Sequence, residues 1–206
     1  FSNLDWRPTP GWQLNLGALV EKNGTAALQF VPRAFVNWQA SATDTFRAGY
    51  SRAWQQRNLF ELYGDVRAYD PKGAPGAPPI AWPYAPNPNL RPPHVDTVEL
   101  GYLGRFPRLD ATLDVRVFSE RISDFVVRSL LPASPLGPLA LPLPTSQYTN
   151  LASPIELRGV EYQLRTRPWR GGELLLSHTL IDRRMKEEEV RQRTSPHSAS
   201  LTWLQQ

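Results

Sequence analysis

Apolar and polar residues alternate one by one in segment after segment of this sequence. Trp12, Leu14 and Leu16, for example, alternate with Gln13 and Asn15. Successive side chains of a β-strand point to opposite faces of its sheet, so this period of two predicts strands with one apolar and one polar face. The pattern occurs in nine segments, at residues 3–7, 12–21, 33–40, 45–51, 97–102, 110–117, 159–165, 174–180 and 199–203. The chain is therefore predicted to be all-β.

The connections between these segments alternate in length. Short turns are expected at residues 9–11, 42–44, 106–109 and 168–172, and longer links at 23–29, 57–94, 128–155 and 186–197. Outer-membrane barrels have short periplasmic turns and long outer loops, whereas a soluble sandwich has no reason to lengthen every second loop. Most of the segments also approach the roughly 9–11 residues that a tilted strand needs to cross a bilayer. An antiparallel transmembrane β-barrel is the predicted fold.

Charged residues concentrate on the polar phase of the predicted strands. A lipid-exposed Arg or Lys at mid-bilayer costs about 2–4 kcal/mol, so charged side chains should face the barrel lumen. Arg52 lies on the apolar phase, but close to a long link, where this cost falls. The residues expected to face the lumen are Arg47, Glu99, Asp114, Arg116, Glu161 and Arg165.

Aromatic residues gather near the short turns. Trp and Tyr favour membrane–water interfaces, and barrels carry girdles of aromatic residues there. The predicted girdle at the short-turn rim contains Trp6, Trp12, Trp38, Phe46, Tyr102 and Trp169.

The two longest links, 57–94 and 131–154, are rich in Pro and Gly and are expected to be irregular. Long loops are often functional, and aromatic and cationic side chains in the first link suit an anionic, partly apolar ligand. Packing of the loops against one another explains the same residues equally well. The candidate ligand contacts are Tyr63, Arg67, Tyr69, Trp82, Tyr84 and Arg91. The charge run 186–193 is read as a solvated face or as a contact with lipopolysaccharide phosphates.

Composition argues against several other functions. The chain has no Cys, so it offers no disulfide framework, thiolate metal site or Cys nucleophile. Its net charge is +4, but the Arg residues are scattered among acids, so no nucleic-acid partner is expected. His94, His178 and His197 have no metal-ligand spacing, and no nucleophile elbow or phosphate-binding glycine loop is present. We expect neither an enzyme nor a cofactor or metal site.

Several short stretches resemble barrel signatures of TonB-dependent receptors, especially siderophore receptors. The most specific one is 87–92, which with Glu99, Leu100 and Gly101 resembles "Asn-Pro-x-Leu-x-Pro-Glu…Glu-Leu-Gly", although Pro93 replaces the usual Glu. The other similar stretches are 30–39, 46–53 with 59–62, 121–125, 148–150 with 159–161, and 195–197 with Leu201. Together they follow the family order over nearly the whole chain.

The resemblance implies a receptor with a roughly 22-stranded barrel around an N-terminal plug. It also implies a TonB box that takes energy from the inner-membrane TonB complex, and a scarce ligand such as a ferric siderophore. Residues 1–206 are then expected to be part of the barrel domain in the bacterial outer membrane, without the plug and the final strands. A passive porin and a soluble all-β ligand-binding module remain as alternatives.

Overall fold

The computed structural model describes residues 1–22, 28–131, 144–186 and 195–205, which form two compact units. The first, here called the sheet unit, comprises 1–54, 95–122 and 154–206, and the second, the loop unit, comprises 55–94 and 123–153. The predicted charge run at 186–193 and the Pro-rich part of the second long link lie almost wholly outside the described residues.

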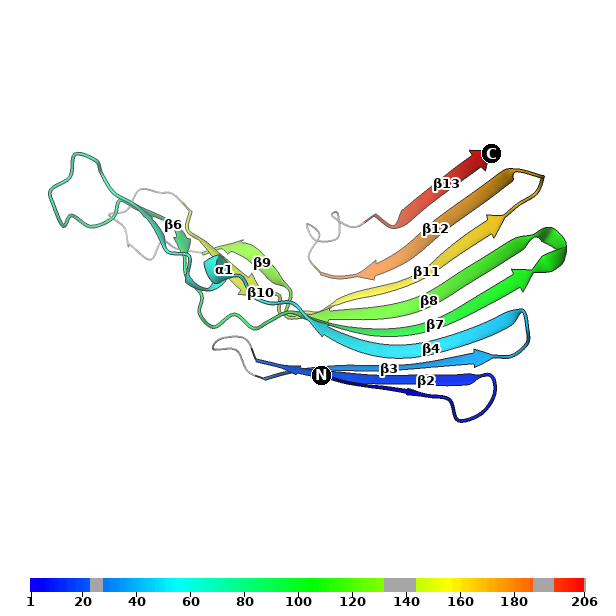
Figure 1. The fold of residues 1–206 in the computed structure, drawn as a ribbon. Helices are drawn as coiled ribbons and strands as arrows, with labels where there is room; N and C mark the ends of the chain where they lie inside the picture. The colour runs from blue at the N-terminus through cyan, green and yellow to red at the C-terminus, as the bar shows by residue number, and fades with distance from the viewer. Residues whose placement is uncertain (23–27, 132–143, 187–194, 206) are drawn as a thin grey trace. The chain divides into compact units, whose positions relative to one another are not determined.

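The sheet unit is a nine-stranded sheet in which strands follow one another in chain order (Figure 1). Its strands are β1 (Ser2–Trp6), β2 (Trp12–Glu21), β3 (Gln29–Gln39), β4 (Asp44–Trp54), β7 (His94–Phe106), β8 (Ala111–Ser123), β11 (Ile155–Thr166), β12 (Gly172–Arg184) and β13 (His197–Gln205). Each coincides with one of the nine predicted segments, and the antiparallel pairing confirms the predicted strand class. In the described residues the sheet is open, with β1 and β13 at its edges.

The short turns also form where they were predicted. The turn before β2 ends at Gly11, whose φ of 84° lies in the left-handed region, and a Cβ there would come 2.9 Å from the carbonyl oxygen of Gln39. Between β7 and β8 the chain makes a 3-10 turn, η1 (Pro107–Leu109), which ends at Asp110 with φ 43°. Asp tolerates this conformation better than most residues do. These residue choices keep the connections tight.

The apolar face of the sheet is not covered by a second layer. Leu100 and Leu201 are 61% and 71% exposed, and Val117 is 48% exposed. Among the described residues of the sheet unit, the buried large hydrophobic side chains are Phe118 and Ile155, which lie on the charged phase of their strands. A water-soluble sheet would bury its apolar face, so this exposure is typical of a sheet that faces lipid.

The loop unit is more ordered than the sequence suggested. A second sheet has the order β5-β6-β10-β9, and its strand β9 (Val126–Leu130) ends just before the second of the two longest links. The helix α1 (Leu59–Tyr63) and the strands β5 (Val66–Ala68), β6 (Ala81–Ala85) and β10 (Ser146–Asn150) lie within the links that were expected to be irregular. The prediction of irregular links was therefore wrong for these residues. The short strands escaped notice because their pairing partners lie far apart in the sequence, and because Pro83 interrupts the alternation in β6.

The loop unit has a small core of its own. Leu62, Ala81, Leu90 and Leu151 are all buried there. Asn58 caps α1 by accepting hydrogen bonds from the backbone of the first turn, and Glu61 closes the capping box. No helix in the described part of the chain has the length and apolar character needed to cross a membrane.

Candidate functional site

Arg116 organises the centre of the charged face. It donates a hydrogen bond of 2.7 Å to Glu99 on β7 and one of 3.1 Å to Glu161 on β11, and it lies 3.8 Å from Glu120. Its guanidinium also stacks over the ring of Phe118 at 4.8 Å from the centroid. One cation therefore serves three carboxylates, which leaves a local excess of negative charge.

Two further ion pairs lie on the same face. Arg47 on β4 donates a hydrogen bond of 3.1 Å to Asp114 on β8. Arg165 on β11 holds Glu173 on β12 with two hydrogen bonds of 2.8 and 3.0 Å, a geometry that favours Arg–carboxylate recognition. The strand register and these contacts place all six residues predicted to face the lumen on one face of the sheet.

Sequence reasoning missed three members of these ion pairs, which are Glu120, Glu173 and Arg167, the last 3.2 Å from Glu173. Glu120 lies four residues after Arg116 on β8, so its side chain points to the same face. Extending the predicted alternation of β8 beyond residue 117 would have found it. Glu173 is the second residue of β12, at a hairpin end where the alternation had not been followed.

Four of the six predicted girdle residues form a row of rings on the apolar face. Trp12 and Trp38 are register partners with centroids 5.7 Å apart, and Trp38 and Phe46 are partners at 5.6 Å. Tyr102 extends the row on β7, 5.2 Å from Phe46, and donates a hydrogen bond to Asp44. The row therefore crosses four neighbouring strands at the height of the short turns.

The other two predicted girdle residues lie apart from this row. Trp6 lies exposed on β1. Trp169 packs edge-to-face on Trp203 of β13, 6.1 Å away, a contact that the sequence reasoning did not anticipate.

All six candidate ligand contacts lie in the loop unit. Arg67 on β5 stacks over the ring of Trp82 on β6 at 4.5 Å from the centroid. The hydrogen bond from Arg67 to Asp65 raises the pKa of Arg67 above its usual value. Tyr69 also raises this pKa, whereas desolvation lowers it. Tyr63 and Tyr69 are 52% and 56% exposed. The arrangement leaves a charged guanidinium held on an aromatic plane.

Tyr84 belongs to a second aromatic group in the same unit. Its ring lies 5.5 Å from Phe60 on α1 and 6.4 Å from Tyr148 on β10. Arg128 on β9 donates a hydrogen bond of 2.9 Å to the Tyr84 hydroxyl. Phe60, Arg128 and Tyr148 were not predicted, because only the sheet pairing brings β9 and β10 to β6.

Arg91 has a different environment. Asn150 on β10 accepts a hydrogen bond from the Arg91 backbone N–H and donates one to its carbonyl, both at 2.8 Å. The Asn150 amide also donates to the carbonyl of Asp124, and the Arg91 guanidinium lies 2.7 Å from the Asp124 carboxylate. Asp124 itself has φ 56°, in the left-handed region. These residues hold three segments together.

Comparison with known proteins identifies the family. A family model described as "TonB dependent receptor-like, beta-barrel" matches residues 1–206. The chain belongs to this family. None of the curated proteins compared with this receptor segment matches it significantly.

Solved receptors share the fold of this TonB-dependent receptor segment. The siderophore receptor PirA from Pseudomonas aeruginosa is 18% identical with a TM-score of 0.69, over 87% of this chain and 32% of that one. The pyoverdine outer membrane receptor FpvA from Pseudomonas aeruginosa PAO1 is 15% identical with a TM-score of 0.68, over 98% and 27%. The copper transporter OprC is 15% identical with a TM-score of 0.58, over 89% and 28%. The segment thus spans about a third or less of these chains.

Two of the stretches that resembled the family meet in the receptor segment. Asn87 donates a hydrogen bond of 2.9 Å to the carbonyl of Tyr148, and Asn150 fastens Arg91 as described above. Leu90, between them, is 2% exposed. The stretches 87–92 and 148–150 therefore act as one structural clamp in the loop unit.

Across the described residues, no group of three or more His, Asp or Glu side chains is arranged to hold a metal ion.

Proposed function

We propose that the chain forms part of the barrel wall of an outer-membrane receptor, which imports a ferric siderophore or a similarly scarce ligand with energy from the TonB complex. The observation that carries the proposal is the sidedness of the sheet unit. One face is apolar, exposed and edged by the row Trp12, Trp38, Phe46 and Tyr102, and the other holds the ion pairs of Arg47, Arg116 and Arg165. Hydrocarbon suits the first face, and a polar lumen suits the second.

The charged face supplies what a plug domain needs. Arg116 is outnumbered by Glu99, Glu161 and Glu120, so this part of the wall has unused acceptors for cationic groups of a plug. We infer that residues 1–206 are part of one barrel domain, and that the rest of the full-length receptor supplies the plug, the TonB box and the remaining strands.

The loop unit supplies the outer ligand contacts in this proposal. Arg67 on Trp82, with the exposed Tyr63 and Tyr69 nearby in the sequence, presents positive charge beside aromatic surface. Such a surface attracts anionic ligands with apolar or aromatic parts. No covalent step is required, because the receptor only has to bind its ligand and release it inward.

The test uses the full-length receptor in its own host. Deletion of the gene should abolish growth on one ferric siderophore, or on one other scarce nutrient such as haem, cobalamin or copper, supplied at limiting concentration. Growth should return with the intact gene but not in a strain without TonB. The receptor should fractionate with the outer membrane.

Two outcomes would overturn the proposal. TonB-independent uptake of many small solutes would indicate a porin. Recovery of folded receptor in the soluble fraction without detergent would indicate a soluble all-β binding module.

A further inference from the structure

A hydrogen-bonded Tyr–His pair lies on the apolar face of the sheet unit. Tyr162 on β11 and His178 on β12 are register partners, with 3.0 Å between the Tyr162 hydroxyl and Nδ1 of His178. Their rings also meet edge-to-face, with centroids 5.3 Å apart. Glu161 holds Arg116 on the charged face, so the alternation of β11 places Tyr162 and its partner on the opposite face. Two polar side chains therefore stand on the face assigned to hydrocarbon.

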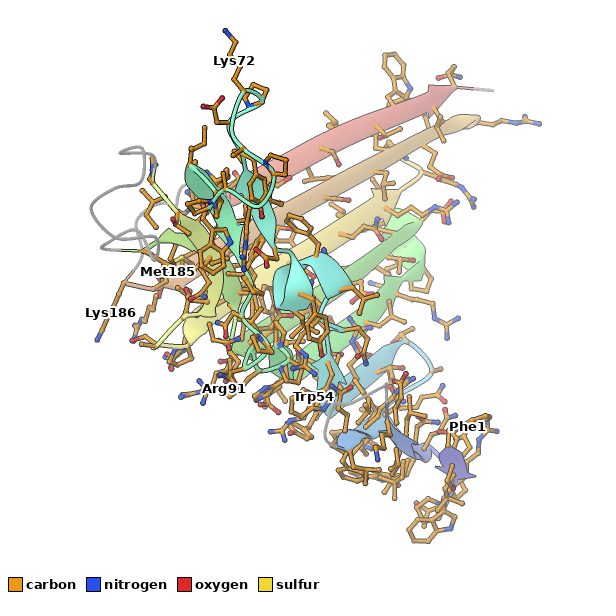
Figure 2. All side chains as sticks on the ribbon, turned by 90° about the vertical axis from the view of Figure 1, so that its left-hand side faces the viewer. Phe1, Trp54, Lys72, Arg91, Met185 and Lys186 are labelled. Atoms are coloured by element: carbon orange, nitrogen blue, oxygen red, sulfur yellow. The ribbon has the colours of Figure 1, made fainter. Side chains whose placement is uncertain are left out.

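The pair lies far from the ends of β12. His178 is the seventh of the 13 residues of this strand, and its neighbours on the same face of the strand are Leu176 and Leu180. The side chains of β12 and β13 project to both sides of the sheet (Figure 2). In the proposed barrel wall His178 is therefore at mid-membrane on the outer side, where neither water nor lipid headgroups reach a side chain.

The second imidazole nitrogen of His178, Nε2, lacks a partner within these strands. The register partner of His178 on β13 is Ala199, which has no polar side-chain atom. His197, also on β13, stacks on the His178 ring with 6.5 Å between the centroids. Within the part of the chain that the structure describes, the His178 side chain forms its hydrogen bond with Tyr162 alone. Lipid tails offer no acceptor, so an unpaired nitrogen facing them is costly.

The pair is complementary to a second copy of itself. A phenol is a stronger hydrogen-bond donor than a neutral imidazole, so the Tyr162 hydroxyl donates to Nδ1 and the imidazole proton lies on Nε2. The Tyr162 oxygen can still accept a bond, because a hydroxyl has two lone pairs. The Nε2–H of one copy can therefore donate to the Tyr162 oxygen of another, and the reverse bond forms at the same time.

We propose that this face joins two copies of the receptor in the outer membrane, through reciprocal hydrogen bonds of Tyr162 and His178. A two-fold axis along the membrane normal keeps each residue at its own depth, so the pair of one copy meets the pair of the other. The apolar face of β8, β11, β12 and β13 covers roughly 800 Å² at the usual length and spacing of strands, which matches the area that each partner buries in a stable interface. Leu180 and Leu201 are exposed on this face and available for packing. This inference rests on the proposed outer-membrane function.

The experiment uses the full-length receptor in native outer membranes. Residues 1–206 contain no Cys, and any cysteine elsewhere in the receptor is first replaced by serine. Ala199→Cys places a thiol beside His178, where oxidation can link two copies across the two-fold axis. The matched control is Ala48→Cys, which places a thiol on the apolar face of β4, outside the proposed interface. The measurement is the amount of disulfide-linked dimer after equal oxidation.

We expect a linked dimer in Ala199→Cys and a monomer in Ala48→Cys. In a receptor without added cysteines, His178→Leu removes both ring nitrogens and should weaken the dimer about tenfold, because a symmetric contact loses two hydrogen bonds of modest strength. Tyr162→Phe removes the acceptor and should have a similar effect. Tyr102→Phe makes the same chemical change on the same face, outside the interface, and should leave the dimer unchanged. The disulfide test remains valid even if a variant at the pair folds poorly.

Several results would overturn the inference. They are a monomer in Ala199→Cys, equal linkage in Ala48→Cys, an unchanged dimer in folded His178→Leu, or a different protein bound to this face in place of the second copy. Nutrient uptake separates the two proposals. A monomer that imports its ligand leaves the receptor function standing without the dimer, and a dimer that imports nothing leaves the dimer standing alone. Absence of the receptor from the outer membrane removes both.

Discussion

Arg47 on β4 reaches Asp114 on β8 across an intervening strand, with 3.1 Å between Nη2 and Oδ1. The contact is possible because β7 presents Gly101 at the crossing point. A Cβ on Gly101 would collide with Nε and the side-chain carbons of Arg47. Glycine usually weakens the interior of a strand, but at position 101 it leaves the space through which Arg47 reaches Asp114.

Gly101→Ala should displace Arg47 and weaken its pair with Asp114. We expect the free energy of unfolding to fall by about 1 kcal/mol, because the pair is partly exposed and the displaced side chain must adopt a poorer rotamer. Urea unfolding of the full-length receptor in detergent measures this change. In an Arg47→Ala background the same substitution should have almost no effect, and an equal effect there would contradict the explanation.

Arg116→Gln should leave Glu99, Glu161 and Glu120 close together without their shared cation. The expected loss is about 2 kcal/mol, less than the roughly 3–5 kcal/mol of fully buried pairs, because these side chains keep some contact with solvent. The matched control is Glu120→Gln, which removes one surplus negative charge and should be neutral or slightly stabilising. Equal losses in both variants would show that Arg116 is not the centre of the network.

Asn150→Asp should open the clamp in the loop unit. The carboxylate cannot donate to the carbonyls of Arg91 and Asp124, and it places negative charge beside them. We expect a local destabilisation of about 1–3 kcal/mol, measured as faster hydrogen exchange at residues 90–91 and 124–126. Asn89→Asp makes the same chemical change on an exposed side chain of the same stretch that takes no part in these hydrogen bonds, and it should leave exchange unchanged.

Trp38→Ala should interrupt the aromatic row between Trp12 and Phe46. Loss of two ring contacts and of the buried ring area should lower stability by about 1–3 kcal/mol, and Trp38→Phe should restore most of it. The position of the row is measured by the quenching of Trp fluorescence with lipids that are brominated near the headgroup. At the membrane interface these lipids should quench Trp38, so Trp38→Ala should reduce the quenched part of the fluorescence. Quenching of Trp38 by a water-soluble agent alone would contradict the girdle.

Arg67 and Arg91 were both predicted to contact the ligand, but their environments differ. Arg67→Gln should raise the ligand concentration for half-maximal uptake by about tenfold and leave stability almost unchanged, because its pair with Asp65 is exposed. Arg91→Gln should loosen the contact with Asp124 and change hydrogen exchange more than uptake. Uptake assays on both variants show which of the two arginines contacts the ligand. Unchanged uptake in Arg67→Gln would show that Arg67 is not part of the ligand site.

The sequence by itself determined the nine strands of the sheet unit, their two faces and the short turns. These features are local, because a period of two places each side chain on a face whatever strand lies beside it, and turns depend on residues such as Gly11 and Asp110. For the same reason, the six charged residues expected on one face are found together there.

Only the tertiary structure decided which residues meet. Arg47 and Asp114 are 67 positions apart, and Asn150 and Arg91 are 59 apart, so no local pattern connects them. The second sheet stayed hidden because its short strands are stable only through partners distant in the chain and through a shared core around Leu62 and Leu90. Register sets these contacts, and register is fixed by the packing of the whole fold.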